Sequence, residues 1–268
     1  MTLFSEVIQA AGATTAAVAN QVDLGDVTLP QSARTITRVW ATVAIVGSFA
    51  AAQSISGYIK LESEDCNIQP FTFPTEIVGG YVTVGGADVK AATKWLVNCP
   101  CVGGTKISVY HIQDDAVAAS EVQVTIEFSD SGSPFPGPQL HMKCAEPSVA
   151  CGTADDGEVS LTDIELKASR LHMLIIYGLQ ATPTEDCALI ATWSVTSDDF
   201  AKQGPWKGSI NPHHGGEANT VQSATELTKI ETDREFLRGG QKQTVSCKAT
   251  ARDACAGDGH YNWCLVYT

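Results

Sequence analysis

Apolar and polar residues alternate with a period of two along much of the chain, which is typical of β-strands. The clearest alternation covers residues 122–129, where Val, Val, Ile and Phe are separated by Gln, Thr, Glu and Ser. Further strands are predicted at residues 39–46, 55–62, 171–177, 188–195, 244–250 and 261–267, and on both sides of the Gly103-Gly104 turn. Because strand signals recur at short intervals with no convincing helix between them, the sequence predicts an all-β sandwich or jelly-roll fold.

The N-terminal segment has a different pattern. Leu3, Phe4, Val7, Ile8 and Ala11 have helical spacing, and an Ala/Thr-rich tract follows them. This spacing predicts a short N-terminal helix or an extended arm. The apolar face is too narrow to form a domain, so we expect the segment to lie on the body of the protein or on a neighbouring subunit.

The chain contains two similar copies of one unit. Residues 107–118 align without a gap with residues 245–256, which places Asp115 opposite Asp253, 138 residues further along the chain. Both copies contain Asp-Ala-x-Ala in this segment. Arg38 and the apolar run after it match Arg170 and its run, and Ser63-Glu64-Asp65 matches Ser197-Asp198-Asp199. The repeat predicts two tandem antiparallel sandwiches, an architecture that serves more often as a scaffold or binder than as an enzyme.

Composition shifts divide the chain into four predicted parts. An arm or helix occupies residues 1–27, and the first sandwich occupies residues 28–132. Proline and glycine mark a linker at residues 133–157, and the second sandwich follows at residues 158–268. Within the second sandwich, residues 202–234 are polar and predict a long insertion, which in a compact β domain is usually functional or interfacial.

The charge of the chain argues against direct binding of nucleic acid. There are 17 basic and 30 acidic residues, a formal net charge of −13, and the first basic residue is Arg34. Such a chain repels polyanions and has no basic arm. The N-terminus also lacks the positive region of a secretory signal, so we expect synthesis in the cytoplasm without a signal peptide. No apolar run approaches the roughly 20 residues that span a bilayer, and we expect no transmembrane segment.

Nine cysteines leave two interpretations open, and their odd number leaves at least one thiol unpaired within a monomer. Most could be reduced and buried in strands, as in cytosolic proteins. Alternatively, some could oxidise after the protein leaves the cell, and Cys144 with Cys151 or Cys255 with Cys264 could then form local disulfides. Cys99-Pro100-Cys101 lacks the spacing of a redox motif, so redox catalysis is not expected there.

Few residues predict chemistry. His213 and His214 lie in a Gly/Pro-rich stretch, but adjacent histidines splay apart and no other ligand stands at metal-binding spacing. We therefore expect a solvated or subunit-contact loop. Trp206 is the tryptophan that best fits an exposed contact. The sequence contains no nucleophile elbow, P-loop, dinucleotide fingerprint or His-Glu-x-x-His motif. We expect no catalytic residue, no cofactor and no metal.

Taken together, the duplicated strands after Arg38 and Arg170, the Asp-Ala-x-Ala turns at Asp115 and Asp253, and the missing secretory signal resemble viral capsid proteins of the tandem jelly-roll type. The resemblance implies a non-enzymatic virion protein that self-assembles into trimers or larger capsomers and contacts other virion proteins. The candidate interface residues are Phe4, Val7, Ile8, Trp206, His213 and His214. The alternative is a carbohydrate- or receptor-binding sandwich, such as a lectin, adhesin, decoration or spike protein, and a sandwich hydrolase with two converging carboxylates is a third hypothesis.

Overall fold

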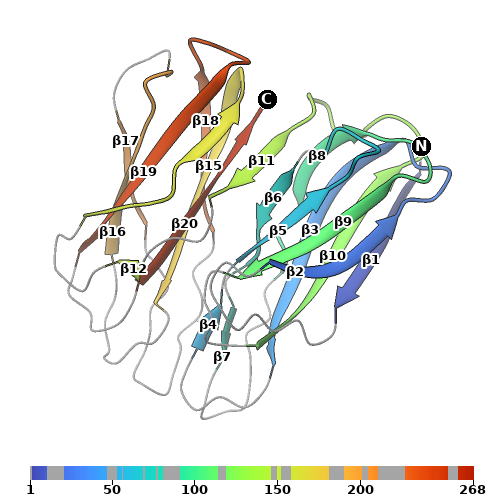
Figure 1. Cartoon of the computed structure of the whole chain (residues 1–268), viewed down its shortest axis with the longest axis horizontal. Helices are drawn as coiled ribbons and strands as arrows, with labels where there is room; N and C mark the ends of the chain where they lie inside the picture. Colours follow the sequence, from blue (N-terminus) through green and yellow to red (C-terminus); the bar gives the residue numbers. More distant parts are fainter. Residues whose placement is uncertain are drawn as a thin grey trace.

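The computed structural model describes residues 2–10, 21–46, 53–55, 57–68, 70–76, 78–80, 91–113, 119–145, 150–151, 158–180, 190–200, 205–210, 227–252 and 259–268. This part of the chain consists of β-strands, turns and irregular segments and contains no helix. Two sandwiches, one from each half of the chain, lie side by side (Figure 1). The predicted all-β fold is confirmed.

The first sandwich contains two four-stranded antiparallel sheets. Sheet A has the order β1 (Leu3–Ala10), β10 (Ala119–Ser129), β3 (Thr35–Val46), β8 (Trp95–Pro100). Sheet B has the order β2 (Gln21–Thr28), β9 (Lys106–Gln113), β5 (Gly57–Glu62), β6 (Phe71–Pro74). The short strands β4 (Gln53–Ile55) and β7 (Val78–Gly80) pair separately.

The second sandwich repeats this plan. Sheet C has the order β11 (His141–Cys144), β20 (Gly259–Tyr267), β15 (Arg170–Gln180), β18 (Thr228–Glu235), and β12 (Ala150–Cys151) also pairs with β20. Sheet D has the order β13 (Glu158–Ser160), β19 (Lys242–Arg252), β16 (Ile190–Thr196), β17 (Trp206–Ile210), and β14 (Ile164–Lys167) also pairs with β19.

The strand orders of the two halves correspond one to one. Strands β11, β20, β15 and β18 of sheet C take the places that β1, β10, β3 and β8 have in sheet A. In the same way, strands β13, β19, β16 and β17 of sheet D take the places of β2, β9, β5 and β6 in sheet B, and β12 and β14 are additional strands. Eight strands in two four-stranded sheets with these crossovers form a jelly roll. The chain is therefore two jelly rolls in tandem.

A repeated hydrogen bond supports the same correspondence in detail. The Ser63 hydroxyl donates to the carbonyl oxygen of Lys106 at 2.6 Å, and the Ser197 hydroxyl donates to that of Thr244 at 2.8 Å. Lys106 and Thr244 are 138 residues apart, the separation that the sequence alignment predicts. The described parts of the aligned segments, residues 107–113 and 245–251, thus lie in the equivalent strands β9 and β19, whereas Asp115 and Asp253 lie outside the described residues.

Of the two forms predicted for the N-terminal segment, a short helix or an extended arm, the helix is wrong for residues 3–10, which form strand β1. Its backbone pairs with β10 from Leu3 opposite Ser129 to Ala10 opposite Val122. Phe4 stacks on Phe128 with ring centroids 5.6 Å apart, and Ile8 packs against the first core. Positions four residues apart share a face in a helix and also in a strand, so Phe4 and Ile8 fit both patterns. Residues 11–20 lie outside the described residues.

The polar segment 202–234 is also not one long insertion. It contains β17, which lies at the edge of sheet D, and most of β18, which lies at the edge of sheet C. Edge strands have one hydrogen-bonding side and often one face in water, so polar residues suit them and weaken the strand signal. Residues 211–226 lie outside the described residues.

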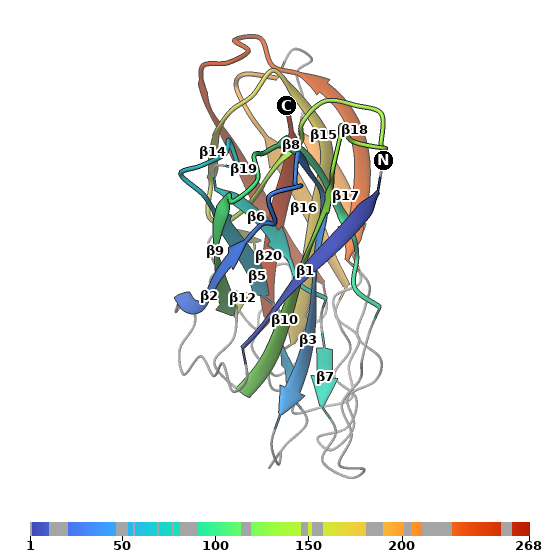
Figure 2. The same cartoon turned by 90° about the vertical axis from the view of Figure 1, so that its right-hand side faces the viewer.

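The two sandwiches share apolar packing. One core lies inside the second sandwich around Trp263, whose indole nitrogen donates to the carbonyl oxygen of Thr162 at 3.0 Å. The other core fills the first sandwich and continues across the junction to residues of β15 and β20, among them Ile175 and Val266. Seen from the side, the strands of both halves run along one common long axis (Figure 2).

Within the predicted linker 133–157, the residues next to the first sandwich are tied to it. Asn98 is a non-glycine residue with a positive φ, 52°, and its side-chain amide donates to the carbonyl oxygen of Phe135 at 3.3 Å. The Arg38 guanidinium lies 4.6 Å from the centroid of the Phe135 ring. β11 and β12 follow in the same range and belong to sheet C.

Candidate functional site

The junction between the sandwiches is formed by the outer face of sheet C, the face that points away from the second core. Its apolar residues are packed in the first core rather than the second: Met142, Cys144, Ile175, Cys264 and Val266. Strands β11 and β6 lie against each other there. The backbone N–H of Leu140 donates to the carbonyl oxygen of Val97 at 2.9 Å, and Lys229 donates to the Thr93 hydroxyl at 3.1 Å. The first sandwich thus covers this face.

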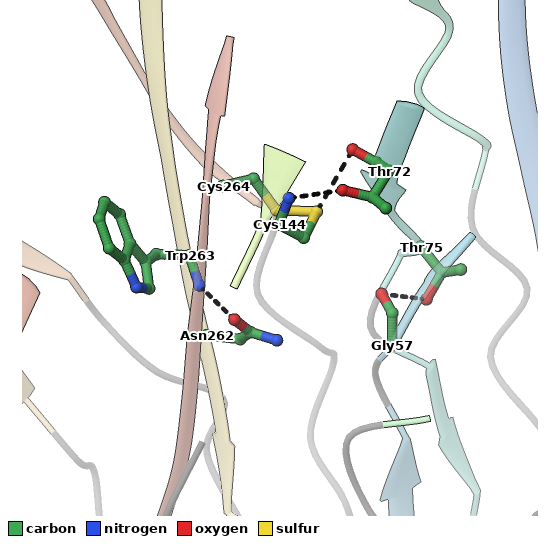
Figure 3. Close-up of a disulfide and its surroundings, with 7 residues drawn as sticks. All are labelled: Gly57, Thr72, Thr75, Cys144, Asn262, Trp263 and Cys264. Carbon is green, nitrogen blue, oxygen red and sulfur yellow. Dashed lines mark hydrogen bonds between the residues drawn. A yellow bond between two sulfur atoms is a disulfide. The ribbon is translucent and has the colours of Figure 1, made fainter. Parts of the chain in front are cut away.

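A disulfide lies at this junction (Figure 3). Cys144 of β11 and Cys264 of β20 are directly opposite in the strand pairing and are bonded to each other. Cys264 and Trp263 point to opposite sides of β20. The backbone N–H of Cys144 donates to the Thr72 hydroxyl of the first sandwich at 2.6 Å. The predicted local pairs of Cys144 with Cys151 and of Cys255 with Cys264 are therefore wrong, because the antiparallel register brings together cysteines 120 residues apart.

The outer face of sheet A is the topological equivalent of that junction face. Leu3 and Val7 of β1 lie on it and are 40% and 50% exposed. Val7 is opposite Thr125, which is in turn opposite Trp40, so the three side chains form a row across the sheet. The Lys94 ammonium lies 4.5 Å from the centroid of the Trp40 ring. This face therefore presents apolar side chains to solvent along the edge strand β1.

An ion pair occupies the middle of the same face. Arg38 donates to both carboxylate oxygens of Glu127 at 2.8 Å, and the Thr37 hydroxyl donates to one of them at 2.7 Å. Burial opposes ionisation of Glu127, but the bonds from Arg38 and Thr37 outweigh it and lower the pKa of this carboxyl below its usual value. Since the bidentate pair satisfies the charges of both partners, it fixes the centre of sheet A.

A second candidate site, besides the outer face of sheet A, is an acidic hollow of about 520 Å³ beside the loop after β5. Glu62, Glu64 and Asp65 line it together with Lys106 and Tyr110. Asp65 accepts a hydrogen bond from the backbone N–H of Lys106 at 2.9 Å, which fixes one wall of the hollow. Such a hollow offers an aromatic ring and several acceptors to a polar ligand.

Inside the first sandwich, His111 of β9 is buried without a hydrogen-bond partner for Nδ1. Burial lowers the pKa of His111 to about 4, so the imidazole is neutral in the folded protein near neutral pH. The aligned position in the second sandwich is Ala249, which is also buried. A neutral, buried histidine is not exposed to act as a catalytic base. Its effect is to make the folding stability of the first sandwich sensitive to acid.

The predicted interface residues are distributed over both sandwiches. Val7 lies on the outer face of sheet A, whereas Phe4 and Ile8 lie on the opposite face of β1. Trp206 of β17 is half-buried, with its ring centroid 6.0 Å from that of Phe200. His213 and His214 lie outside the described residues. The structure does not bring the described candidates into one cluster.

Sequence reasoning missed Trp40, Arg38 and Glu127 as members of this outer face. A signal was present, because Trp40 alternates with the buried residues Val39 and Ala41 and so belongs to the other side of its strand. The sequence could not show whether that second side is covered by protein, because covering depends on how the two sandwiches pack.

Two kinds of site are absent from the described residues. No group of three or more His, Cys, Asp or Glu side chains is arranged to hold a metal ion there. In the same residues, no helix has the length and apolar character needed to cross a membrane.

No protein-family model matches the chain, and no curated protein is similar to it in sequence. Solved structures resemble it in fold. A structure of Sulfolobus Turreted Icosahedral Virus has a TM-score of 0.44 at 10% identity, covering 99% of this chain and 90% of that one. Recombinant N-glycanase F has a TM-score of 0.43 at 9% identity, with coverages of 98% and 95%. The major capsid protein P2 of bacteriophage PM2 has a TM-score of 0.36 at 11% identity, with coverages of 98% and 97%.

Proposed function

We propose that this protein is a structural subunit of a virus shell that associates with further copies of itself and with other virion proteins, and that it is not an enzyme. The observation that supports the proposal is the fusion of two jelly rolls of identical strand order into one block with a shared core. Jelly rolls recur in capsid proteins, where double-sheet closure protects their edges and leaves outer surfaces free for contacts between subunits.

The two outer faces support a specific proposal for how copies associate. Within the chain, the first sandwich covers the outer face of sheet C. The equivalent face of sheet A has exposed apolar side chains at Leu3 and Val7 on its edge strand. A second copy that packs on sheet A would repeat, between subunits, the type of contact that already exists within one chain. Such a contact is heterologous, and heterologous contacts build rings where the rotation between subunits closes and open filaments where it does not.

A pair of matched double variants tests this assignment. In Leu3→Lys/Val7→Lys, two charges stand on the outer face of sheet A, and we expect the assembly to dissociate because burial of unpaired ammonium groups is costly. The control is Val102→Lys/Leu237→Lys, which adds the same charge at positions that are 61% and 66% exposed and lie outside the strands of sheet A.

Sedimentation velocity over a concentration series distinguishes the outcomes. We expect the wild-type protein and the control to sediment as the same large species, and the Leu3→Lys/Val7→Lys variant to sediment as a monomer. If the sheet A variant assembles like the control, sheet A is not the contact surface. If the wild type is monomeric at every concentration, the shell proposal itself fails.

The alternative function is binding of a carbohydrate or receptor, and the acidic hollow beside Tyr110 is the feature that favours it. Trp206, on which the sequence-based version of this hypothesis depends, packs against Phe200 instead. A glycan array probed with the wild type and with Tyr110→Ala separates the two functions. A consistent sugar preference that Tyr110→Ala abolishes would favour the binding module, whereas a shell subunit would show no such preference.

A further inference from the structure

A register shift at the same place in sheets A and C fixes which of their residues are equivalent. In sheet A the shift is at Thr37 of β3, where the pairing with both β10 and β8 skips a residue. In sheet C the shift is at His172 of β15, and the pairing with β20 and β18 changes in the same way. Alignment of the two shifts makes Trp40 equivalent to Ile175, three residues further along the chain than the sequence-based match of these strands places it.

One row of outward-facing side chains crosses each sheet at this level. On sheet A the row consists of Val7, Thr125 and Trp40. On sheet C it consists of Cys144, Cys264 and Ile175, and all three are buried in the core that the first sandwich extends across the junction. Val7 of β1 therefore has the place on sheet A that Cys144 of β11 has on sheet C.

Within the chain, one edge of the first sandwich covers this part of sheet C. The Thr72 hydroxyl of β6 accepts the backbone N–H of Cys144 at 2.6 Å, and the Thr72 carbonyl oxygen lies 3.6 Å from the Cys144 sulfur. On the same edge, the Val97 carbonyl oxygen of β8 accepts the backbone N–H of Leu140 at 2.9 Å. Strands β6 and β8, the last strands of sheets B and A, thus form the covering edge.

The equivalent edge of the second sandwich consists of β17 and β18, and Lys207 has the place of Thr72 on it. Thr72 is opposite Lys60 of β5, and Lys207 is opposite Ser194 of β16. Lys60 and Ser194 correspond, because each lies three residues before the serine of the repeated hydrogen bond. Lys207 is exposed, and no strand among the described residues is paired to the other edge of β17.

We propose that the β17–β18 edge of one copy packs on β1 and the outer face of sheet A of the next copy, with Lys207 against Val7. This contact depends on the association of copies proposed above, and it repeats between chains the fit of the β6–β8 edge on sheet C. Strands β1 and β17 lie at opposite ends of the block (Figure 1). They can therefore meet only between copies, and the contact is heterologous.

The two replaced residues make this contact weaker than the junction within the chain. Val7 cannot form the disulfide that Cys144 forms, and the Lys207 side chain has no acceptor for the hydrogen bond that Thr72 accepts. The aliphatic stem of Lys207 instead covers Val7 while its ammonium group stays in water. We therefore expect copies to associate reversibly, whereas the junction within each chain stays closed.

A pair of engineered thiols tests the contact in the full chain. In Val7→Cys/Lys207→Cys, oxidation with diamide should link copies into dimers and larger species on a non-reducing gel. The control is Val7→Cys/Lys242→Cys, because the Lys242 side chain is 63% exposed on β19, two strands away from β17. We expect the first variant to cross-link at least roughly tenfold faster than the control, since the contact holds its thiols at a high effective concentration. Equal rates would overturn the assignment of the β17 edge.

A lysine-specific cross-linker tests the same contact without any substitution. Ordinary and heavy-isotope-labelled protein are mixed before assembly, so that a mixed-isotope peptide pair reports a link between copies. We expect such a pair between Lys207 and Lys94, because the Lys94 ammonium lies 4.5 Å from the Trp40 ring centroid in the row of Val7. Mixed-isotope links of Lys207 only to lysines outside sheet A would overturn the proposal.

Failure of this contact and failure of the shell proposal give different results. A wild-type protein that sediments as a large species but gives neither the thiol nor the lysine cross-link removes the β17–β18 contact and leaves the shell proposal standing. A wild type that is monomeric at every concentration removes both.

Discussion

The outer faces of sheets A and C occupy equivalent places in the two jelly rolls but have different chemistry. On sheet C, Ile175 and Val266 are buried against the first sandwich, and the face is apolar. On sheet A, the corresponding area holds the Arg38–Glu127 ion pair, with exposed apolar side chains along the edge strand β1. One topology therefore supports both a covered, largely apolar face and a mixed face, and the packing partner determines which residues each needs.

The edge strands of the two sheets, β11 and β1, differ in the same way: the first is covered and the second is exposed. β11 has four residues, and the Cys144–Cys264 disulfide and the hydrogen bond to Thr72 hold it in the junction. Its equivalent β1 has eight residues, pairs with β10 along its whole length, and has no strand paired to its other edge among the described residues. An open edge with apolar side chains is where β-proteins associate, unless charge or covering protects it.

The largest expected difference between the two faces follows from truncating one residue on each. Ile175→Ala removes a fully buried side chain between the sandwiches, and we expect it to reduce the free energy of unfolding by about 3 kcal/mol. Val7→Ala on sheet A should cost within about 0.5 kcal/mol in the monomer. Urea denaturation of both variants measures the difference. Equal losses would mean that the junction is not packed as a core.

His111 should make the first sandwich sensitive to acid. Its pKa is lowered to about 4 by burial, from 6.5, so the unfolded state binds a proton that the folded state does not. The contribution of His111 to the free energy of unfolding is therefore constant above about pH 6.5. As the pH falls from 6.5 to 4, the free energy of unfolding declines by about 3 kcal/mol in total. Stability curves of wild type and His111→Leu between pH 4 and 7 check this. Parallel curves would contradict it, because only the wild type should have this slope.

A smaller effect separates a partly buried ion pair from an exposed one. Glu127→Gln should cost about 2 kcal/mol at neutral pH, because Arg38 would lose its bidentate partner in a nearly buried position. Since the pKa of Glu127 is lowered in the folded state, this contribution is lost as the pH falls below the ordinary glutamate value of 4.5. Glu235→Gln, which breaks the exposed pair with Arg170, is the control and should change stability by about 0.5 kcal/mol or less. Thermal unfolding of the two variants measures the difference. Similar shifts in melting temperature would contradict the prediction that burial strengthens the Arg38–Glu127 pair.

Much of the fold could be predicted because strand periodicity and internal repetition are local properties of the sequence. The alternation at residues 122–129 lies in β10, and the aligned residues 107–113 and 245–251 lie in the equivalent strands β9 and β19. The errors arose where local pattern is ambiguous. Phe4 and Ile8 satisfy helical and strand spacing alike, and the edge strands β17 and β18 are polar enough to look like an insertion.

The candidate surfaces depended on information that the sequence does not contain. Cys144 and Cys264 are adjacent only because β11 and β20 pair in one register. Trp40 could be assigned to the second side of its strand, but its exposure depends on which outer face the first sandwich covers. These are long-range consequences of topology, which short-range patterns do not encode.

The most direct test of the shell proposal is electron microscopy of the concentrated native protein. We predict regular particles or repeating capsomers of one size, built from the two-jelly-roll block, and their absence in the Leu3→Lys/Val7→Lys variant. Fields of isolated monomers from the wild-type protein, at concentrations at which the control variant is equally monomeric, would contradict the account.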